Sequence, residues 1–398
     1  MDTRRGAALP LTAFPDAADL RRRDGEKWAV ARQGMLASWV ADMDFPVADV
    51  IREAVLRRTR GDLGYPVWFD ESRGGPLGEA FADRMLRRHG HAPDPTHVRL
   101  FTDVNQALLA MLRSATDPGD GVLLHTPACP PFVDVIARVG RRPLTVPVHE
   151  SEHGWEFPLA PMKEAADAEG RTRVLFLVNP HNPTGRVLRR AELEELAAFA
   201  LERDLLVVSD EVHADLVHAP HRHIPFASLG PDVAARTITL TSGSKAFNLA
   251  GVRCAVAHIG PRAVRDAVDA QQGLLYGQVS VLAVEALKAA WTAGDDWLDQ
   301  VLQVLAHNRG RLLESLPRGV RCHTPEATFL AWLDCRALGL GDDPMRFFRD
   351  EAGVLLFSGP SFGPEGEGFV RLNFGTSPRI LEEILERMDS AVRGHRNT

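Results

Sequence analysis

From residue 98 onward the sequence alternates short apolar runs with stretches of helical periodicity. Helical stretches such as 190–203 separate the runs, which cover residues 121–125, 174–178, 205–209, 237–241 and 252–257. Nearly continuous apolar strands separated by helices are typical of a parallel sheet that helices cover on both faces. Ligands of such sheets bind beyond the carboxyl ends of the strands, so we expect a site in the segments that follow the runs.

The two ends of the chain indicate a second, smaller unit. Residues 37–46 have the pattern of a short strand that ends in paired carboxylates, and Pro46 is expected to begin a helix through about residue 60. After residue 285 the expected elements are helices at 285–293 and 297–316, strands at 327–334, 354–357 and 368–374, and a closing helix from Pro378 to about residue 392.

This pattern predicts an α/β chain with three αβα layers and a mixed, mostly parallel sheet. We expect an N-terminal arm and part of the small domain in residues 1–46, a large domain in 47–284 and a small α+β domain in 285–398. The proline-interrupted start of the chain is interpreted as a poorly ordered arm rather than an export signal.

Composition narrows the class of protein. The 398 residues are 45% hydrophobic and carry a formal net charge of -7, with acidic and basic residues interspersed, so no basic face for nucleic acid is expected. No apolar stretch approaches the ~20 residues that span a membrane. Four widely separated cysteines without a C-x-x-C pair favour reduced thiols in a cytoplasmic protein without a metal site.

The turn from Thr241 to Arg253 presents one lysine directly after an apolar run. Lys245 stands among small and apolar neighbours, and partial burial lowers the pKa of an amine and leaves it able to form a Schiff base with an aldehyde. Arg253 can hold a phosphate. Together they indicate pyridoxal 5'-phosphate, provided that a carboxylate is available for its pyridinium nitrogen. Taken alone, the stretch fits a surface lysine in a Ser/Gly loop equally well.

Other strand ends supply suitable groups. Asp210 and His213 follow one apolar run and can meet a planar ring from two sides, and the turn after another run holds Asn182 as a side-chain donor. The helix expected after the segment from Thr102 to Gln106 can receive a phosphate at its N-terminus. Arg371, on a later strand, can bind a carboxylate through two hydrogen bonds. Capping or turn formation explains each residue singly, but their convergence favours a cofactor site.

These motifs resemble a known group of enzymes. Asn182-Pro-Thr-Gly, Asp210-x-x-His213, Ser242-Gly-Ser-Lys245 and Arg253 resemble the signature of fold-type I pyridoxal phosphate enzymes, the aspartate aminotransferase superfamily. Further segments are similar to the MalY/PatB-type cystathionine β-lyases, namely Trp39-Val-Ala-Asp-Met-Asp-Phe-Pro46, Gly64-Tyr65, Ser209-Asp-Glu-Val-His-Ala-Asp-Leu216, Ser244-Lys-Ala-Phe-Asn-Leu-Ala-Gly251 and Gly359-Pro-Ser-Phe-Gly363. The similarity runs from about residue 35 to 390 and implies the PLP-transferase fold.

The resemblance also implies residue roles. Lys245 would carry the cofactor and act as general base, Asp210 would pair with the pyridinium nitrogen, and Asn182 and His213 would lie near the ring hydroxyl. The phosphate ligands would be Ser242, Ser244, Arg253 and the amides around Val104 and Asn105. Arg371 would bind the α-carboxylate of an amino-acid substrate, with Asp42 and Asn182 beside it. Tyr65 would reach in from the second subunit of a homodimer with a shared active site.

The implied reaction is α,β-elimination on an S-substituted cysteine, which releases a thiol, pyruvate and ammonia. An aminotransferase shares every cofactor residue and stays open as an alternative. Decarboxylation or oxidative deamination of a similar conjugate is a further one. A regulatory protein that binds pyridoxal phosphate is disfavoured, because Lys245 is present and no DNA-binding helix pair precedes residue 35.

Two positions depart from the family pattern. Asp103 stands where the phosphate loop usually has glycine, and we expect its side chain to turn away or to cap the following helix. Cys129 replaces the aromatic residue that usually stacks on the cofactor ring. Relaxed packing is one explanation for Cys129. The interpretation that we favour is a pocket enlarged for a bulky S-substituted cysteine.

Overall fold

The computed structural model describes residues 14–32, 34–67, 74–167, 170–271 and 275–396. Residues 1–13, which make up most of the proline-interrupted start expected to form a poorly ordered arm, therefore lie outside the described residues. Within them, no helix is long and apolar enough to cross a lipid bilayer.

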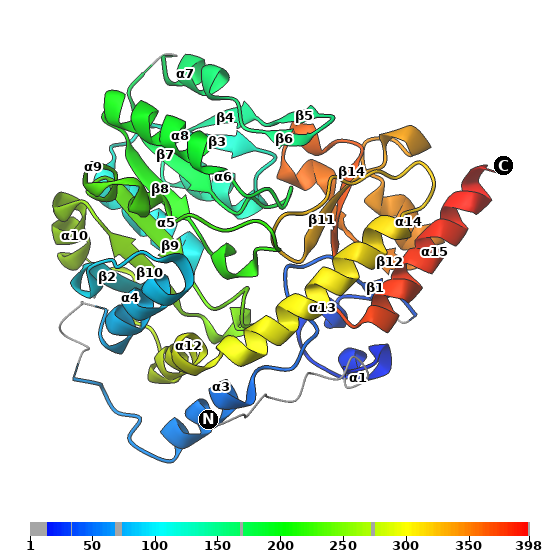
Figure 1. Cartoon of the computed structure of the whole chain (residues 1–398), viewed down its shortest axis with the longest axis horizontal. Helices are drawn as coiled ribbons and strands as arrows, with labels where there is room; N and C mark the ends of the chain where they lie inside the picture. The colour runs from blue at the N-terminus through cyan, green and yellow to red at the C-terminus, as the bar shows by residue number, and fades with distance from the viewer. Residues whose placement is uncertain (1–13, 33, 68–73, 168–169, 272–274, 397–398) are drawn as a thin grey trace.

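A seven-stranded sheet forms the centre of the larger unit (Figure 1). Its spatial order is β2 (Val98–Phe101), β10 (Ala255–Ile259), β9 (Thr237–Thr241), β8 (Leu206–Asp210), β7 (Thr172–Val178), β3 (Gly121–Thr126) and β4 (Arg142–Pro147). Only β10 runs against its neighbours β2 and β9, while the other pairs are parallel. The predicted mixed, mostly parallel sheet is confirmed.

Side-chain alternation along the strands creates two separate apolar layers. In β7, Val174 and Phe176 join the core beneath α5 (Val104–Ala115), α6 (Pro130–Arg138) and α10 (Arg262–Asp269). Leu175 and Leu177 face the opposite core, beneath α7 (Leu159–Asp167), α8 (Arg190–Glu202) and α9 (Pro231–Ala234). Because successive residues of a strand point to opposite faces, an uninterrupted apolar run serves both layers.

The third core belongs largely to the C-terminal part of the chain, drawn in yellow to red in Figure 1. Its antiparallel sheet has the order β11 (Leu330–Asp334), β14 (Phe369–Asn373) and β13 (Phe357–Ser358), and its long helices are α13 (Asp295–Glu314) and α15 (Pro378–Arg396). The N-terminal strand β1 (Leu36–Ala37) pairs in parallel with β12 (Val354–Leu355). The first residues of the chain therefore pack with its last third, although the exact domain boundaries stay a prediction.

The remaining elements connect these cores. The helices are α1 (Ala17–Arg21), α2 (Glu26–Ala29), α3 (Asp49–Thr59), α4 (Pro76–His89), α12 (Val281–Ala293) and α14 (Met345–Glu351). A two-stranded hairpin is formed by β5 (His149–Ser151) and β6 (Gly154–Glu156). Helix α12 packs against α3 and α4, which places these three helices side by side below the sheet in Figure 1.

Three expected elements were misplaced. The strand predicted at 37–46 ends at Ala37, because the backbone after it makes scattered hydrogen bonds, to backbone groups of Leu355, Asn373 and Gly375 and to the Asn373 side chain, rather than a continuous ladder with one strand. The helix predicted from Pro46 begins at Asp49. The strand predicted at 252–257 begins only at Ala255, because Arg253 has the left-handed φ of 62° that ends a short 3-10 helix.

Asn308 on α13 connects the helix to the end of β14. Its amide nitrogen donates to the carbonyl oxygens of Phe374 at 2.9 Å and Thr376 at 2.8 Å, and the residue is fully buried. Asn308→Ala leaves both carbonyl groups without this donor, so the free energy of unfolding should fall by about 2–4 kcal/mol. Chemical denaturation measures the change. His307→Ala, on the exposed side of the same helix, is the control and should change stability little.

Candidate active site

The extended segment of residues 38–45, which we call the frame segment, positions the side chains of the site. Asn373 on β14 donates through its amide nitrogen to the carbonyl oxygens of Val40 at 2.6 Å and Asp42 at 2.7 Å. From the opposite side, the Asn248 amide nitrogen donates to the carbonyl oxygens of Met43 at 2.9 Å and Phe45 at 3.0 Å. The segment is thus bound both by the small antiparallel sheet and by the turn that carries Lys245.

Lys245 lies half-buried in the turn after β9. Its Nζ donates to the carbonyl oxygen of Ala41 at 2.9 Å, so the frame segment fixes the direction of the amine. Burial lowers the pKa of Lys245, and the nearby negative charge of Asp42 opposes this effect. A partly desolvated amine with a lowered pKa is a suitable nucleophile and proton acceptor.

Asp210 ends β8 and is buried beside this turn. One carboxylate oxygen accepts from the backbone N–H of Val212 at 3.1 Å. Burial raises the pKa of Asp210 to about 7, with the neighbouring Glu211 charge adding to the rise and Lys245 opposing it. A cationic ring nitrogen placed against this carboxylate would favour its ionised form.

His213 follows on the same loop and is equally buried. Burial lowers the pKa of His213 to about 3, with the charges of Lys245 and Arg371 acting in the same direction, so the ring is neutral. Its Nδ1 has no hydrogen-bond partner within the described part of the chain. A buried polar atom without a partner is unusual in a folded protein and indicates a site for a bound group.

Arg371 stands on β14 and is held in a fixed orientation. Its Nη1 donates to the side-chain oxygen of Asn182 at 3.0 Å, and its Nη2 donates to the carbonyl oxygen of Trp39 at 3.0 Å. The guanidinium lies over the rings of Phe357 and Phe362, at 4.7 and 5.0 Å from their centroids. Burial lowers its pKa to about 10, which leaves it cationic at neutral pH. The arrangement is suited to a carboxylate ligand.

The predicted phosphate ligands lie where α5 begins. Asp103 caps this helix by accepting from the backbone N–H of Gln106 at 2.9 Å, and it forms an ion pair with Arg253. The helix cap expected for Asp103 is therefore present. Val104 and Asn105 occupy the first turn, where backbone N–H groups lack acceptors within the helix.

The two serines of the lysine turn are already hydrogen-bonded to protein groups. The Ser242 hydroxyl donates to the carbonyl oxygen of Cys254 at 2.6 Å and accepts from the N–H of Ser244 at 3.0 Å. To donate to a phosphate, the Ser242 hydroxyl would have to leave Cys254. In this structure the Ser242 hydroxyl and the Ser244 backbone N–H therefore donate to protein groups rather than towards a phosphate.

Cys129 begins α6 and faces the same group of charges. Burial raises the pKa of its thiol, while Arg371 and Lys245 lower it, so the side chain is a neutral thiol near both cations. Tyr65 lies apart, 86% exposed in the connection after α3, which runs along the outside of the molecule in Figure 1. The predicted site residues of one chain are thus brought together except for Tyr65.

Several contributors were not expected from the sequence. The carbonyl groups of Trp39 and Ala41 have no residue-type signal, because any residue carries one. Asn248, Phe357 and Phe362 lie in or beside motifs noted for their resemblance, but nothing in their pattern indicates that they hold the frame segment or stack on Arg371.

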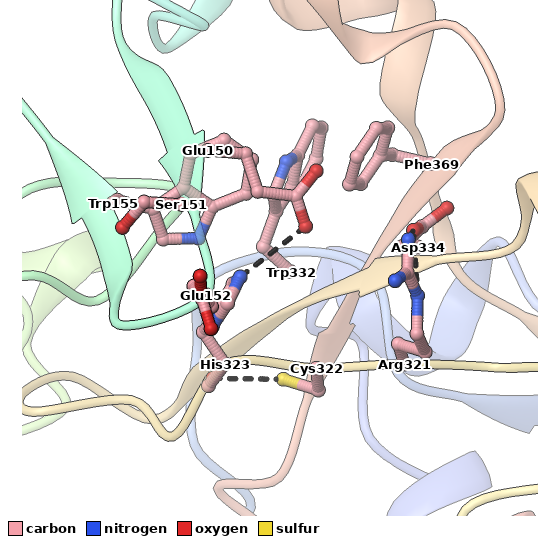
Figure 2. A pocket seen from close by; sticks show the side chains of 10 residues that line it. All are labelled: Glu150, Ser151, Glu152, Trp155, Arg321, Cys322, His323, Trp332, Asp334 and Phe369. Carbon is pink, nitrogen blue, oxygen red and sulfur yellow. Dashed lines mark hydrogen bonds and ion pairs between the residues drawn. The ribbon is translucent and has the colours of Figure 1, made fainter.

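A separate pocket of about 600 Å³ lies between the β5–β6 hairpin and the small antiparallel sheet (Figure 2). It is lined by aromatic rings and by hydrogen-bonded polar side chains such as Glu150 with His323, at 3.2 Å. Of the residues that the structure describes, those lining this pocket include none of the predicted site residues.

Comparisons with known proteins agree with this site. Residues 74–388 match the family model described as aminotransferase class I and II. The chain belongs to this family. The cystathionine beta-lyase PatB of Bacillus subtilis is 34% identical over 366 residues, covering 90% of this chain and 92% of PatB. This similarity places the chain with the MalY/PatB-type members of the family, as its motifs predicted.

Two solved structures extend the comparison. OvoB is 37% identical with a TM-score of 0.87, covering 94% of this chain and 97% of OvoB. The PLP-bound C-S lyase of Staphylococcus hominis is 27% identical with a TM-score of 0.87, covering 95% of this chain and 98% of the lyase. The fold is therefore that of the fold-type I enzymes.

The ion pair between Asp103 and Arg253 is expected to limit the affinity of the protein for the phosphate of the cofactor. Asp103→Asn keeps a helix-capping side chain but removes the carboxylate that competes for Arg253 and repels a phosphate. We expect the variant to bind pyridoxal phosphate about tenfold more tightly. Equilibrium dialysis measures the change in affinity.

Asp94→Asn is the matched control, because Asp94 also caps a short helix, through Thr96 N–H at 2.9 Å, but at the opposite end of β2. Unchanged or weaker cofactor binding by the Asp103 variant would contradict the electrostatic argument.

Proposed function

We propose that this chain is a pyridoxal 5'-phosphate-dependent carbon–sulfur β-lyase that acts on an S-substituted cysteine. The proposed reaction type rests on the 34% identity of this chain to PatB along nearly the whole of both chains. The cofactor residues alone cannot select it, because aminotransferases share them. The products would be a thiol, pyruvate and ammonia.

The residues present fit the cofactor. Lys245 offers an amine for the aldehyde, Asp210 a buried carboxylate for the ring nitrogen, and His213 an unpartnered Nδ1 at the ring. Arg253 and the first turn of α5 offer positive charge and N–H groups to the phosphate. When bound, pyridoxal phosphate supplies an electron sink for the negative charge that develops at the substrate's α-carbon.

The chain's own groups would then orient the amino acid and move its protons. Arg371, held by Asn182, would bind the α-carboxylate and so present the Cα–H bond to Lys245. The neutral Lys245 amine would take the Cα proton, and the electrons of that bond would expel the thiolate from Cβ. Asp42 would stabilise the resulting ammonium group of Lys245, and hydrolysis of the remaining three-carbon fragment would give pyruvate and ammonia.

The position of Cys129 supports a substrate with a bulky sulfur substituent. The thiol occupies less volume than the aromatic residue usual at this position, and it lies near both Lys245 and Arg371. A smaller side chain there would leave more space beside the groups that would hold the reacting carbon atoms. A larger thioether than that of a simple S-alkylcysteine would fill it.

We further propose a cytoplasmic homodimer with a shared active site. Helix α3 and the connection after it expose apolar side chains that a second copy would cover: Leu56 on the helix is 50% exposed, and in the connection Leu63 is 53%, Tyr65 86% and Val67 96% exposed. Tyr65 would reach the partner's cofactor from this segment. The four cysteines are free thiols, which is consistent with a reducing compartment.

Lys245 can be tested directly as the cofactor-linking residue, because the chain has only four lysines. Borohydride reduction of the protein loaded with pyridoxal phosphate should leave a permanent adduct on the peptide that contains Lys245, as detected by mass spectrometry. Lys245→Ala should lose this adduct, and exposed Lys288→Ala should retain it. An adduct on buried Lys27, which pairs with Asp44 of the frame segment, would overturn the assignment.

The reaction type is tested by incubating the loaded protein with S-alkyl- and S-arylcysteines. We expect thiol, pyruvate and ammonia in equal amounts without any added amino acceptor, with higher kcat/KM for the bulkier substituents. Keto acid that forms only when an acceptor is added, without free thiol, would identify an aminotransferase instead. Release of carbon dioxide would indicate a decarboxylating reaction.

A further inference from the structure

Helix α4 carries an arginine on its apolar face. The buried side chains of this helix recur at the spacing of one helical face, at positions 77, 80, 81, 84 and 85. The others are Leu, Ala, Phe and Met, but position 84 holds Arg84, whose side chain is only 4% exposed. A buried charge is costly unless it is paired and hydrogen-bonded, so the groups around Arg84 must compensate it.

Two carboxylates from different parts of the chain compensate this charge. Arg84 Nε donates to Asp215 Oδ2 at 2.9 Å, and Arg84 Nη1 donates to Asp295 Oδ1 at 2.9 Å. Asp215 lies in the loop after β8, two residues beyond His213, and Asp295 begins α13. Burial raises the pKa of Asp215, but the nearby positive charge, chiefly that of Arg84, outweighs this effect and holds the pKa well below its ordinary value. The ion pair therefore persists at neutral pH.

The third neighbour of the guanidinium is an aromatic ring of the lysine turn. The central carbon atom of the Arg84 guanidinium lies 5.0 Å from the centroid of the Phe247 ring, which is within the range of a cation–π contact. Phe247 is fully buried and stands two residues after Lys245. A planar guanidinium can stack on a ring while its N–H groups reach two carboxylates, whereas the compact ammonium of a lysine cannot.

The junction between α12 and α13 packs against the same ring. Gly294, directly before Asp295, lies so close to Phe247 that a Cβ atom at Gly294 would come within 2.7 Å of a ring carbon. The ring of Trp297 stacks on that of Phe247, at 6.1 Å between centroids. The Phe247 ring therefore has little freedom to move, and Arg84 and this junction together set its position.

Arg84 thus links the loop that carries Asp210 to the turn that carries Lys245. The ladder between β8 and β9 ends where Asp210 pairs with Leu240, five residues before Lys245. The spacing between carboxylate and amine therefore depends on contacts made beyond the ladder, and one guanidinium bound to both segments supplies such a contact. A planar ligand held at one end by Asp210 and at the other by Lys245 requires this spacing to be correct.

We propose that Arg84 is a positioning residue, which sets the spacing between Asp210 and Lys245 through its contacts with Asp215 and Phe247. Arg84 touches neither the substrate nor the cofactor in this role. The inference rests on the proposed function, because it takes Asp210 as the partner of the ring nitrogen of pyridoxal phosphate and Lys245 as the partner of its aldehyde.

The test compares Arg84→Met with Arg87→Met in protein saturated with pyridoxal phosphate. Arg87, which is 45% exposed on the same helix, binds Asp295 and the Trp291 carbonyl oxygen. Its loss removes an ion pair from α4 and leaves the contacts of Arg84 with Asp215 and Phe247 in place, so Arg87→Met is the matched control.

We expect Arg84→Met to lower kcat for thiol release at least about tenfold, because small displacements of reacting groups reduce rates strongly. KM should change less than about threefold, since Arg371, which would bind the α-carboxylate, stands on β14. Arg87→Met should leave both constants within about twofold of the wild-type values.

The visible circular dichroism of the bound cofactor supplies a readout that a loss of stability alone does not change. This signal depends on the orientation of the ring in its chiral site, so it should fall in Arg84→Met and stay unchanged in Arg87→Met. Chemical denaturation establishes that both variants are folded under the assay conditions. Equal losses of kcat in the two variants, or a folded Arg84→Met protein with wild-type kcat and dichroism, would overturn the proposal.

A double-mutant cycle tests whether Arg84 acts through the lysine turn. In a Phe247→Leu background, which lacks the ring beside the guanidinium, Arg84→Met should lower kcat less than about threefold further. A further tenfold loss would show that the two side chains act independently and would contradict the role.

A second variant keeps the proposal testable if Arg84→Met does not fold. Arg84→Lys retains the positive charge, but its ammonium cannot reach both carboxylates while it stacks on Phe247. We expect a smaller decrease in kcat and in dichroism, in the same direction. Wild-type values of both for Arg84→Lys would then refute the positioning role.

Failure of the proposed function gives a different result. In that case the wild-type protein itself binds no pyridoxal phosphate or releases no thiol. If it binds the cofactor without releasing thiol, the dichroism comparison still tests Arg84, because that signal requires only the bound cofactor. The positioning role is refuted by the comparison of variants, whereas the proposed function is refuted by the wild-type protein alone.

Discussion

The site depends on the capture of residues 38–45 between two parts of the molecule. Asn373 binds the segment from the small antiparallel sheet, and Asn248 binds it from the turn that follows β9. Because the bonds are to backbone groups, the segment is held in position without being part of a sheet. Its carbonyl groups can then orient Lys245 and Arg371 at once, which fixes the distance between amine and guanidinium.

Burial shifts the pKa values of the charged side chains at this site. Desolvation shifts the pKa of Lys245, Asp210 and Arg371 in the direction that favours the neutral form of each side chain. In each case a charged or polar neighbour opposes the shift. A bound zwitterionic amino acid with an anionic, ring-containing cofactor would complete the charge pairing. Without ligands, the buried charges of the site are only partly compensated, and ligands of opposite charge would complete the compensation. Such shifted pKa values are typical of catalytic sites.

The departures from the family pattern lie on different sides of the cofactor. Asp103 changes the phosphate end, where it caps α5 and neutralises Arg253. Cys129, which lies near Arg371 and Lys245, would change the ring face, where its small thiol would stand in place of the aromatic residue that the family resemblance leads us to expect. In the proposed function, both substitutions would weaken cofactor binding and would leave the residues around the reacting carbon atoms in place. Substrate choice and cofactor exchange are therefore the properties in which this chain should differ most from its relatives.

Local chemistry was sufficient to predict the central sheet, the lysine turn and the polar groups at the strand ends, because strand period and burial are properties of neighbouring residues. It was also sufficient to predict that Asp103 caps a helix. The bonds of Lys245 to Ala41 and of Arg371 to Asn182 and Trp39, as well as the ion pair of Arg84 with Asp215, were decided only by the tertiary structure. They join segments distant in sequence, often through backbone carbonyl groups that every residue carries, so no sequence pattern distinguishes them.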